Sequence, residues 1–157
     1  ISVQTLRKHI QVHGDVRLFS DLPRVLSHPP GCVFVYQGPV AVYDFISWCP
    51  LTTPPFPGHF NQQIESNATG MDMLEELNRI FRTPPRSVIT QTSPRIDENM
   101  AVYDRLEETL HADYHEVYRY VPPVRHHALT RTGQLILVVY ARNEQAAPSP
   151  PDGHREP

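Results

Sequence analysis

Hydrophobic residues along the chain alternate between the spacing of helices and the short apolar runs of strands. Apolar residues recur every three or four positions at Met71, Leu74, Leu77 and Phe81, a period that predicts an amphipathic helix. The almost continuous apolar run at 134–141 favours a strand that is covered on both faces. The same reasoning predicts helices over 1–12, 21–27, 71–81 and 97–110, and strands over 32–36, 40–46, 87–92, 115–121 and 134–141.

Proline and small polar residues separate these elements. Ser20 is placed to cap the second predicted helix, as Asp97 is for the last one. The stretch 50–70 is rich in Pro, Thr and Asn and predicts an irregular loop. We expect one α/β domain over 1–142 and a Pro-rich, extended or disordered tail over 143–157. Since helices alternate with buried strands, the domain should have three layers, with helices on both faces of a sheet.

A Pro-Pro-aromatic motif, Thr53-Pro54-Pro55-Phe56, follows the apolar segment Val40–Trp48. Together with the helix, strand, helix and two strands predicted after it, this order resembles the C-terminal half of a class I, Rossmann-like methyltransferase, over Val40 to Arg142. The resemblance implies a partial Rossmann-like sheet that ends in an antiparallel strand pair. It also implies that the motif binds the amine substrate.

The cofactor-binding motif of that family is missing from the sequence. The family binds its cofactor at a Gly-rich turn after the first strand, and no two of the seven glycines form Gly-x-Gly. Thr53 also stands where the family's motif usually has Asn, Asp or Ser. We therefore expect no bound cofactor on this chain alone.

Histidine and cysteine are the candidates for metal or nucleophilic chemistry. His9 and His13 share a helix face, but zinc needs three or four converging ligands, so we expect exposed histidines and no metal site. Cys32 and Cys49 flank two predicted strands. They could form a disulfide, or one could be a nucleophile with His59 as its base. We expect instead two small, buried thiols.

Composition bears on partners and location. The 157 residues carry a net charge of −3, which argues against a dedicated nucleic-acid-binding protein, and no apolar run is long enough to span a membrane. Two cysteines favour an intracellular location, although Asn67-Ala68-Thr69 matches the N-glycosylation pattern. Lys8 is the single lysine beside 13 arginines, and the chain begins at Ile1. These features are compatible with a processed product and allow a mitochondrial location.

The segment 31–64 has the composition of a protein interface. Asp44 is its one charged residue, and it holds seven of the 14 aromatic residues of the chain. Interfaces are enriched in aromatic residues and depleted in charge, although a loop folded over its own sheet has the same composition. We expect docking on a partner through Trp48, Pro54, Pro55, Phe56 and Phe60.

A second candidate surface is basic. Arg119, Arg125 and Arg131 lie close together in the sequence and could bind an anion such as an RNA phosphate, with neighbouring tyrosines to stack on bases. Nearby acidic residues and the negative net charge argue against direct contact with nucleic acid.

These observations favour a non-catalytic accessory or structural subunit of a larger assembly, which docks through its aromatic loop and its tail. The alternative is an S-adenosylmethionine-dependent, methyltransferase-like enzyme that a missing half or a partner chain completes; an interaction module of viral or regulatory origin is a third option. An enzyme should have a cleft lined by polar groups at the carboxyl ends of the strands. A subunit should instead expose Trp48, Phe56 and Phe60 when the chain is alone.

Overall fold

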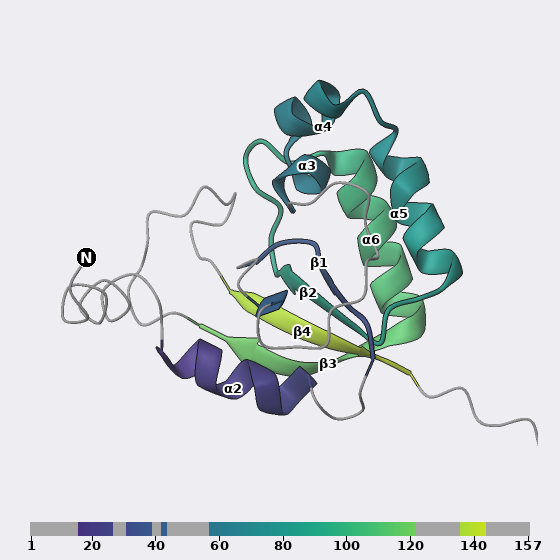
Figure 1. Cartoon of the computed structure of the whole chain (residues 1–157). Coiled ribbons are helices and arrows are strands. Elements are labelled where there is room, and N and C mark those ends of the chain that lie inside the picture. The colour runs from purple at the N-terminus through teal and green to yellow at the C-terminus, as the bar shows by residue number, and fades with distance from the viewer. Residues whose placement is uncertain (1–15, 27–30, 39–41, 44–56, 122–135, 144–157) are drawn as a thin grey trace, which may run out of the picture.

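A four-stranded mixed sheet with the strand order β1-β2-β4-β3 forms the middle of the protein (Figure 1). β1 and β2 are parallel, whereas β4 is antiparallel to both of its neighbours. The C-terminal strands β3 and β4 therefore form the antiparallel pair that the sequence predicts. The strands are β1 (Val33–Val35), β2 (Ser87–Gln91), β3 (Tyr114–Tyr120) and β4 (Leu137–Arg142).

Five helices accompany the sheet in the part of the chain that the structure, a computed structural model, describes. That part comprises residues 16–26, 31–38, 42–43, 57–121 and 136–143. The helices are α2 (Val16–Leu26), α3 (Gly58–Asn61), α4 (Gln63–Thr69), α5 (Met73–Arg82) and α6 (Met100–Asp113). Within these residues, no helix is long and apolar enough to cross a membrane.

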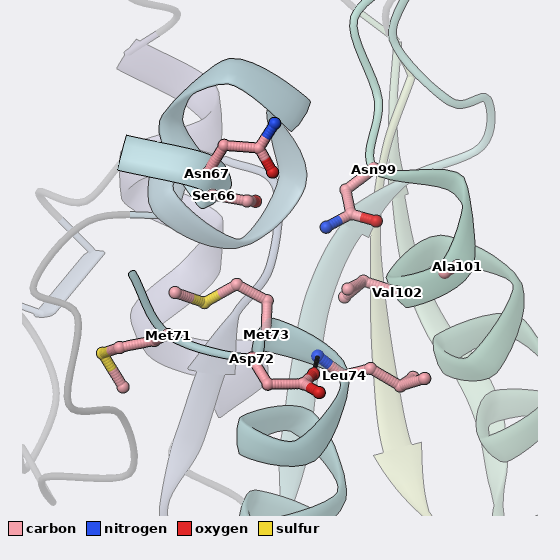
Figure 2. Close-up of a pocket in the computed structure, with 9 residues that line it drawn as sticks. All are labelled: Ser66, Asn67, Met71, Asp72, Met73, Leu74, Asn99, Ala101 and Val102. Atoms are coloured by element: carbon pink, nitrogen blue, oxygen red, sulfur yellow. Dashed lines mark hydrogen bonds between the residues drawn. The ribbon is translucent and has the colours of Figure 1, made fainter. Parts of the chain in front are cut away.

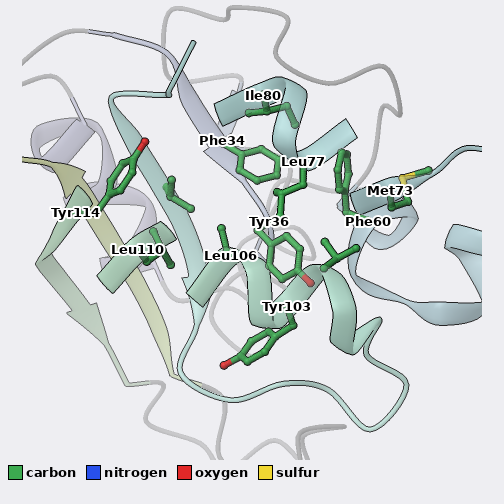
Figure 3. Packing of buried hydrophobic residues seen from close by; sticks show 12 residues of the cluster. Phe34, Tyr36, Phe60, Met73, Leu77, Ile80, Tyr103, Leu106, Leu110 and Tyr114 are labelled. Atoms are coloured by element: carbon green, nitrogen blue, oxygen red, sulfur yellow. The ribbon is translucent and has the colours of Figure 1, made fainter. Parts of the chain in front are cut away.

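The helices cover both faces of the sheet and give a three-layer α/β fold. Because side chains alternate along a strand, Val33 and Val35 face a core formed with α2. Phe34 and Tyr36 face the other core, which α5 and α6 cover (Figure 3). Leu22 of α2 and Leu77 of α5 are almost fully buried in these two cores. The predicted fold class is confirmed.

Two predicted helix starts are wrong. Ser20 lies inside α2, where its hydroxyl donates to the carbonyl of Arg17 at 2.8 Å. The leucines of α2 recur every four residues and bury one stripe against the sheet, and this burial extends the helix back beyond Ser20. Asn99 precedes α6 in place of Asp97. The Asp97 carboxylate accepts from Arg95 Nε at 3.1 Å.

The predicted irregular loop at 50–70 contains helices α3 and α4 in its described part. These residues lack an apolar stripe, and tertiary contacts hold them instead. Phe60 is buried in the core, and the Ser66 hydroxyl donates to the carbonyls of His59 and Phe60. The predicted strand over 40–46 is described only at Val42 and Tyr43, which lie in a helical turn outside the sheet.

A β-bulge interrupts the regular alternation of side chains along β3. Glu116 pairs with Tyr140 and Tyr118 with Val139, so Val117 is an extra residue in the strand. In a regular strand, residues 116 and 119 would lie on opposite faces. The bulge turns both to one side, and Arg119 Nε donates to Glu116 Oε1 at 2.8 Å.

Candidate functional site

A cluster of buried polar side chains lies at the carboxyl end of β1. Tyr36 and Gln37 follow β1 directly, and Asn61 and Glu98 come from distant parts of the chain. All four are at least nine-tenths buried, and Glu98 is 6 % exposed. We call these four residues the Glu98 cluster. Buried polar groups are costly unless they are hydrogen-bonded, so their partners decide what the cluster does.

The Glu98 carboxylate accepts hydrogen bonds on both oxygens. The Tyr36 hydroxyl donates to Oε1 at 2.6 Å. Gln37 Nε2 and the backbone N–H of Arg95 donate to Oε2, the latter at 2.9 Å. Hydrogen bonds to a charged acceptor are stronger than neutral ones. Glu98 therefore fastens the end of β1 to the segment that leads into α6.

Asn61 extends the cluster to α3. Its side-chain Nδ2 donates to the backbone carbonyl of Tyr36 at 2.7 Å. Its backbone carbonyl accepts from the backbone N–H of Asn99, also at 2.7 Å. The neighbouring side chain of Phe60 is buried in the core and orients this turn. The cluster thus joins β1, α3 and the start of α6.

Burial is the main cause of the pKa shifts in the Glu98 cluster. It raises the pKa of Glu98 above its ordinary value, although the hydrogen bonds from Tyr36 and Arg95 act in the opposite direction. The pKa of Tyr36 is raised well above its ordinary value by burial and then by the charge of Glu98. A carboxyl group with a raised pKa is of the kind that transfers protons in enzymes. Here its hydrogen bonds to the chain's own donors connect secondary-structure elements.

A pocket of about 300 Å³ lies beside the cluster, between α4 and the first turns of α5 and α6 (Figure 2). Helix N-termini lie at the carboxyl side of parallel strands, which is where α/β proteins bind ligands. The Asp72 carboxylate lines the pocket and caps α5 by accepting from the N–H groups of Leu74 and Glu75, each at 3.0 Å. Asn67 and Asn99 add carboxamides. Methionine, leucine, alanine and valine side chains complete the lining, so the walls suit a ligand that has both polar and apolar parts.

The predicted exposure of Phe60 is wrong. Its side chain is 1 % exposed and packs edge-on against Phe34, with ring centroids 5.6 Å apart. An aromatic ring gains more by burial in a core than on an open surface, and the turn of α3 directs it inward. Phe60 therefore cannot dock on a partner. Trp48, Pro54, Pro55 and Phe56 lie outside the described residues.

Arg119 is engaged within its own strand. Its guanidinium forms two hydrogen bonds with Glu116, which lower the pKa of that carboxyl and raise the pKa of Arg119. An anion would have to compete with Glu116 for Arg119. Arg125 and Arg131 lie outside the described residues, so the predicted grouping of the three arginines stays a prediction.

The expectation of two buried thiols is wrong for Cys32. This cysteine is disulfide-bonded and therefore has no thiol to act as a nucleophile. The one other cysteine of the chain is Cys49, which lies outside the described residues. Within the described ranges, no group of three or more His, Cys, Asp or Glu side chains could hold a metal ion.

The sequence patterns missed Tyr36, Gln37 and Glu98. Tyr36 ends an apolar run and reads as a strand residue, and Glu98 stands in an acidic stretch typical of a helix start. The one local signal is that the apolar run 32–35 is followed by Tyr36 and Gln37, which places two polar side chains at the end of a strand. The pairing of Tyr36 with Glu98 across 62 positions has no local signal.

The fold and this site define a class: a three-layer α/β domain with a buried polar cluster at the carboxyl end of its parallel strands. No protein-family model matches the chain, and no curated protein or solved structure is significantly similar to it.

Proposed function

We propose that the chain is a non-catalytic accessory subunit of a larger protein assembly, and that it docks on a neighbouring subunit along the outer edge of β3. One observation carries the proposal. Val117 in β3 and Val121 directly after it are 43 % and 48 % exposed, and among the described residues β3 has a partner strand on one side only. Apolar side chains at a sheet edge are suited to contact with another protein.

Features of β3 favour docking by side chains over the addition of a strand. The bulge at Val117 interrupts the ladder, and Glu116 and Arg119 form an ion pair beside it. Bulges and charges are devices that prevent edge strands from pairing with other chains. The valines remain accessible, so a partner would cover Val117 and Val121 and meet the Glu116–Arg119 ion pair beside Val117.

The start of the tail lies beside the first residues of β3, on the side of β4. The N–H of Asn143 donates to the carbonyl of Asp113 at 2.8 Å, and Asn143 Oδ1 lies 2.8 Å from His115 Nδ1. A tail that continues from Asn143 therefore starts beside the first residues of β3. This supports a neighbour that contacts both the tail and the first residues of β3.

Co-purification tests the proposal. The tagged chain would be isolated from its own cells at moderate salt, and mass spectrometry would identify the proteins that stay attached. We expect a complex of fixed stoichiometry that Val117→Ser/Val121→Ser weakens. Ile96→Ser is the matched control, because Ile96 is 66 % exposed outside β3, and it should leave the complex unchanged.

The outcomes separate the parts of the proposal. Recovery of the wild-type chain as a lone monomer would contradict the subunit function. An intact complex with Val117→Ser/Val121→Ser would contradict docking on β3. Trp48→Ser/Phe56→Ser tests the aromatic loop in the same assay, and Phe60→Ser is unsuitable because Phe60 belongs to the core.

A methyltransferase-like enzyme is the second candidate. The order β1, helices, β2, α6, β3 and β4 supports it, since the resemblance implies a strand, helix, strand, helix and antiparallel pair. In this interpretation β1 replaces Val40–Trp48 as the first strand. Calorimetry with S-adenosylmethionine, on the chain with its co-purified partners, tests this candidate. It predicts saturable binding that Asn99→Ala in the pocket weakens, and an absence of binding would contradict it.

A further inference from the structure

We propose that Asn67 carries an N-linked oligosaccharide, acquired in an oxidising compartment before the chain folds. Asn67 is the one asparagine in the sequence that has Ser or Thr at the second position after it. Its side chain is exposed on α4, at the rim of the pocket (Figure 2). The inference concerns a modification and does not rest on the proposed docking function.

The geometry of Asn67 leaves its acceptor atom available. Gln63 Nε2 donates to Asn67 Oδ1 at 3.1 Å, one helical turn away. This hydrogen bond uses the amide oxygen and orients the amide nitrogen, Nδ2, away from Gln63. A sugar bonded to Nδ2 would extend into solvent, and the folded chain could keep all contacts of α4.

The hydroxyl of Thr69 indicates when the transfer takes place. In the folded chain it donates to the carbonyl of Ser66 at 2.8 Å and accepts from the N–H of Met71 at 3.1 Å. A transferase that reads this hydroxyl must therefore act before α4 forms. A helix of seven residues is marginal without tertiary contacts, so the segment is accessible on the unfolded chain.

The disulfide at Cys32 is independent evidence for the compartment. Cys32 is disulfide-bonded, and disulfides form and persist in oxidising compartments and are rare in the cytosol. N-glycosylation acceptor sites likewise act in secreted proteins. The exposed pattern at Asn67 and the bond at Cys32 therefore point to the same compartment.

The surroundings of Asn67 suit a glycan. Ile64 lies three residues earlier on α4 and is 77 % exposed, and residues three apart are neighbours on a helix surface. The first sugars on Asn67 would cover this apolar side chain. α4 and β3 lie at opposite ends of the protein (Figure 1), so the glycan would leave Val117 and Val121 free.

The transfer is a substitution at the first sugar carbon. The bond between that carbon and the phosphate oxygen of a lipid-linked oligosaccharide diphosphate breaks. A bond from the carbon to Asn67 Nδ2 forms, and the lipid diphosphate leaves with the electron pair of the broken bond. The amide nitrogen loses one proton to the solvent. No oxidant or reductant takes part in this step.

The experiment uses the full chain isolated from its own cells. Treatment with a peptide N-glycosidase should increase its gel mobility and convert Asn67 to Asp, which mass spectrometry of the peptide identifies. Asn67→Gln and Thr69→Ala should each abolish the mobility shift. Thr69→Ser should keep it, because serine also completes the acceptor pattern.

Detection of the Asn67 peptide only in its unmodified form would overturn the proposal. So would a mobility shift that persists in Asn67→Gln. Co-purified partners should be the same for Asn67→Gln and the wild-type chain. A failure of the glycan proposal is thereby distinguishable from a failure of docking on β3, which the variant Val117→Ser/Val121→Ser tests.

Discussion

The hydroxyl of Tyr36 donates a hydrogen bond of 2.6 Å to the carboxylate of Glu98, across 62 residues of sequence, and both side chains are buried. This contact connects the end of β1 with the segment before α6. Gln37 and the backbone of Arg95 donate to the same carboxylate. The stability of this end of the sheet should therefore depend on Glu98.

Replacement of Glu98 by Gln should lower the free energy of unfolding at neutral pH by about 1–3 kcal/mol. The new NH₂ group would face either the hydroxyl of Tyr36 or the N–H donors of Gln37 and Arg95. Since two donors cannot bond to each other, at least one buried hydrogen bond would be lost. Urea denaturation measures the change. Glu65→Gln, at an exposed position of α4, is the control and should change stability by less than about 0.5 kcal/mol. Equal stability of the two variants would contradict the role of Glu98.

The raised pKa of Glu98 predicts a pH dependence. Burial raises its pKa above the ordinary 4.5, so between the two values the folded chain binds more protons than the unfolded chain. Stability must then fall as the pH rises through this window. The difference in unfolding free energy between wild type and Glu98→Gln should decrease from pH 4 upward and level off above the raised pKa. A difference that increases with pH would show that the pKa is lowered.

Truncation should lower stability strongly at Phe60 and hardly at all at Ile64. Phe60→Ala should cost about 3–5 kcal/mol, because it leaves a cavity beside Phe34 in the core. Ile64→Ala should change stability by less than about 0.5 kcal/mol, because Ile64 is exposed. Thermal or urea unfolding of both variants measures this contrast. Similar effects would mean that Phe60 is not a core residue.

The ion pair beside the bulge in β3 predicts that the pKa of Glu116 depends on Arg119. Arg119 lowers the pKa of Glu116, so Arg119→Met should return it to the ordinary range, as measured by NMR. The pair stabilises the fold above the ordinary pKa of Glu and loses this effect as the pH falls. Since both side chains are more than a third exposed, the loss should stay below about 1 kcal/mol. Arg105→Met, which removes the partner of Glu108, should leave Glu116 unchanged. A Glu116 pKa that does not move in Arg119→Met would contradict the pairing.

The bond at Cys32 predicts the outcome of a thiol titration. The denatured chain should show no free thiol without reductant and two after reduction. Cys32→Ser should lower the free energy of unfolding by about 2–4 kcal/mol, a typical effect of a lost disulfide. Two reactive thiols in the unreduced protein would contradict the bond.

Local sequence patterns were sufficient for much of the fold. The predicted helices at 71–81 and 97–110 correspond to α5 and α6, and the predicted strands at 87–92 and 134–141 correspond to β2 and β4. The two helices bury helically spaced residues, and the two strands follow apolar runs, and both patterns are visible within about ten residues. The three-layer arrangement follows from this order of elements.

Local patterns thus predicted the fold class, the helices with an apolar stripe and the strands with apolar runs other than the run at 40–46, where Val42 and Tyr43 lie outside the sheet. The tertiary structure decided the rest, because it depends on contacts between distant residues. α3 and α4 lack a stripe and are held by Phe60 and Ser66. The bulge turns Glu116 to the side of Arg119, and the candidate site forms only where the folded chain brings Glu98 to Tyr36. A pattern along the chain records which residues prefer burial, whereas the pairing of two buried polar groups is decided when the sheet and helices pack.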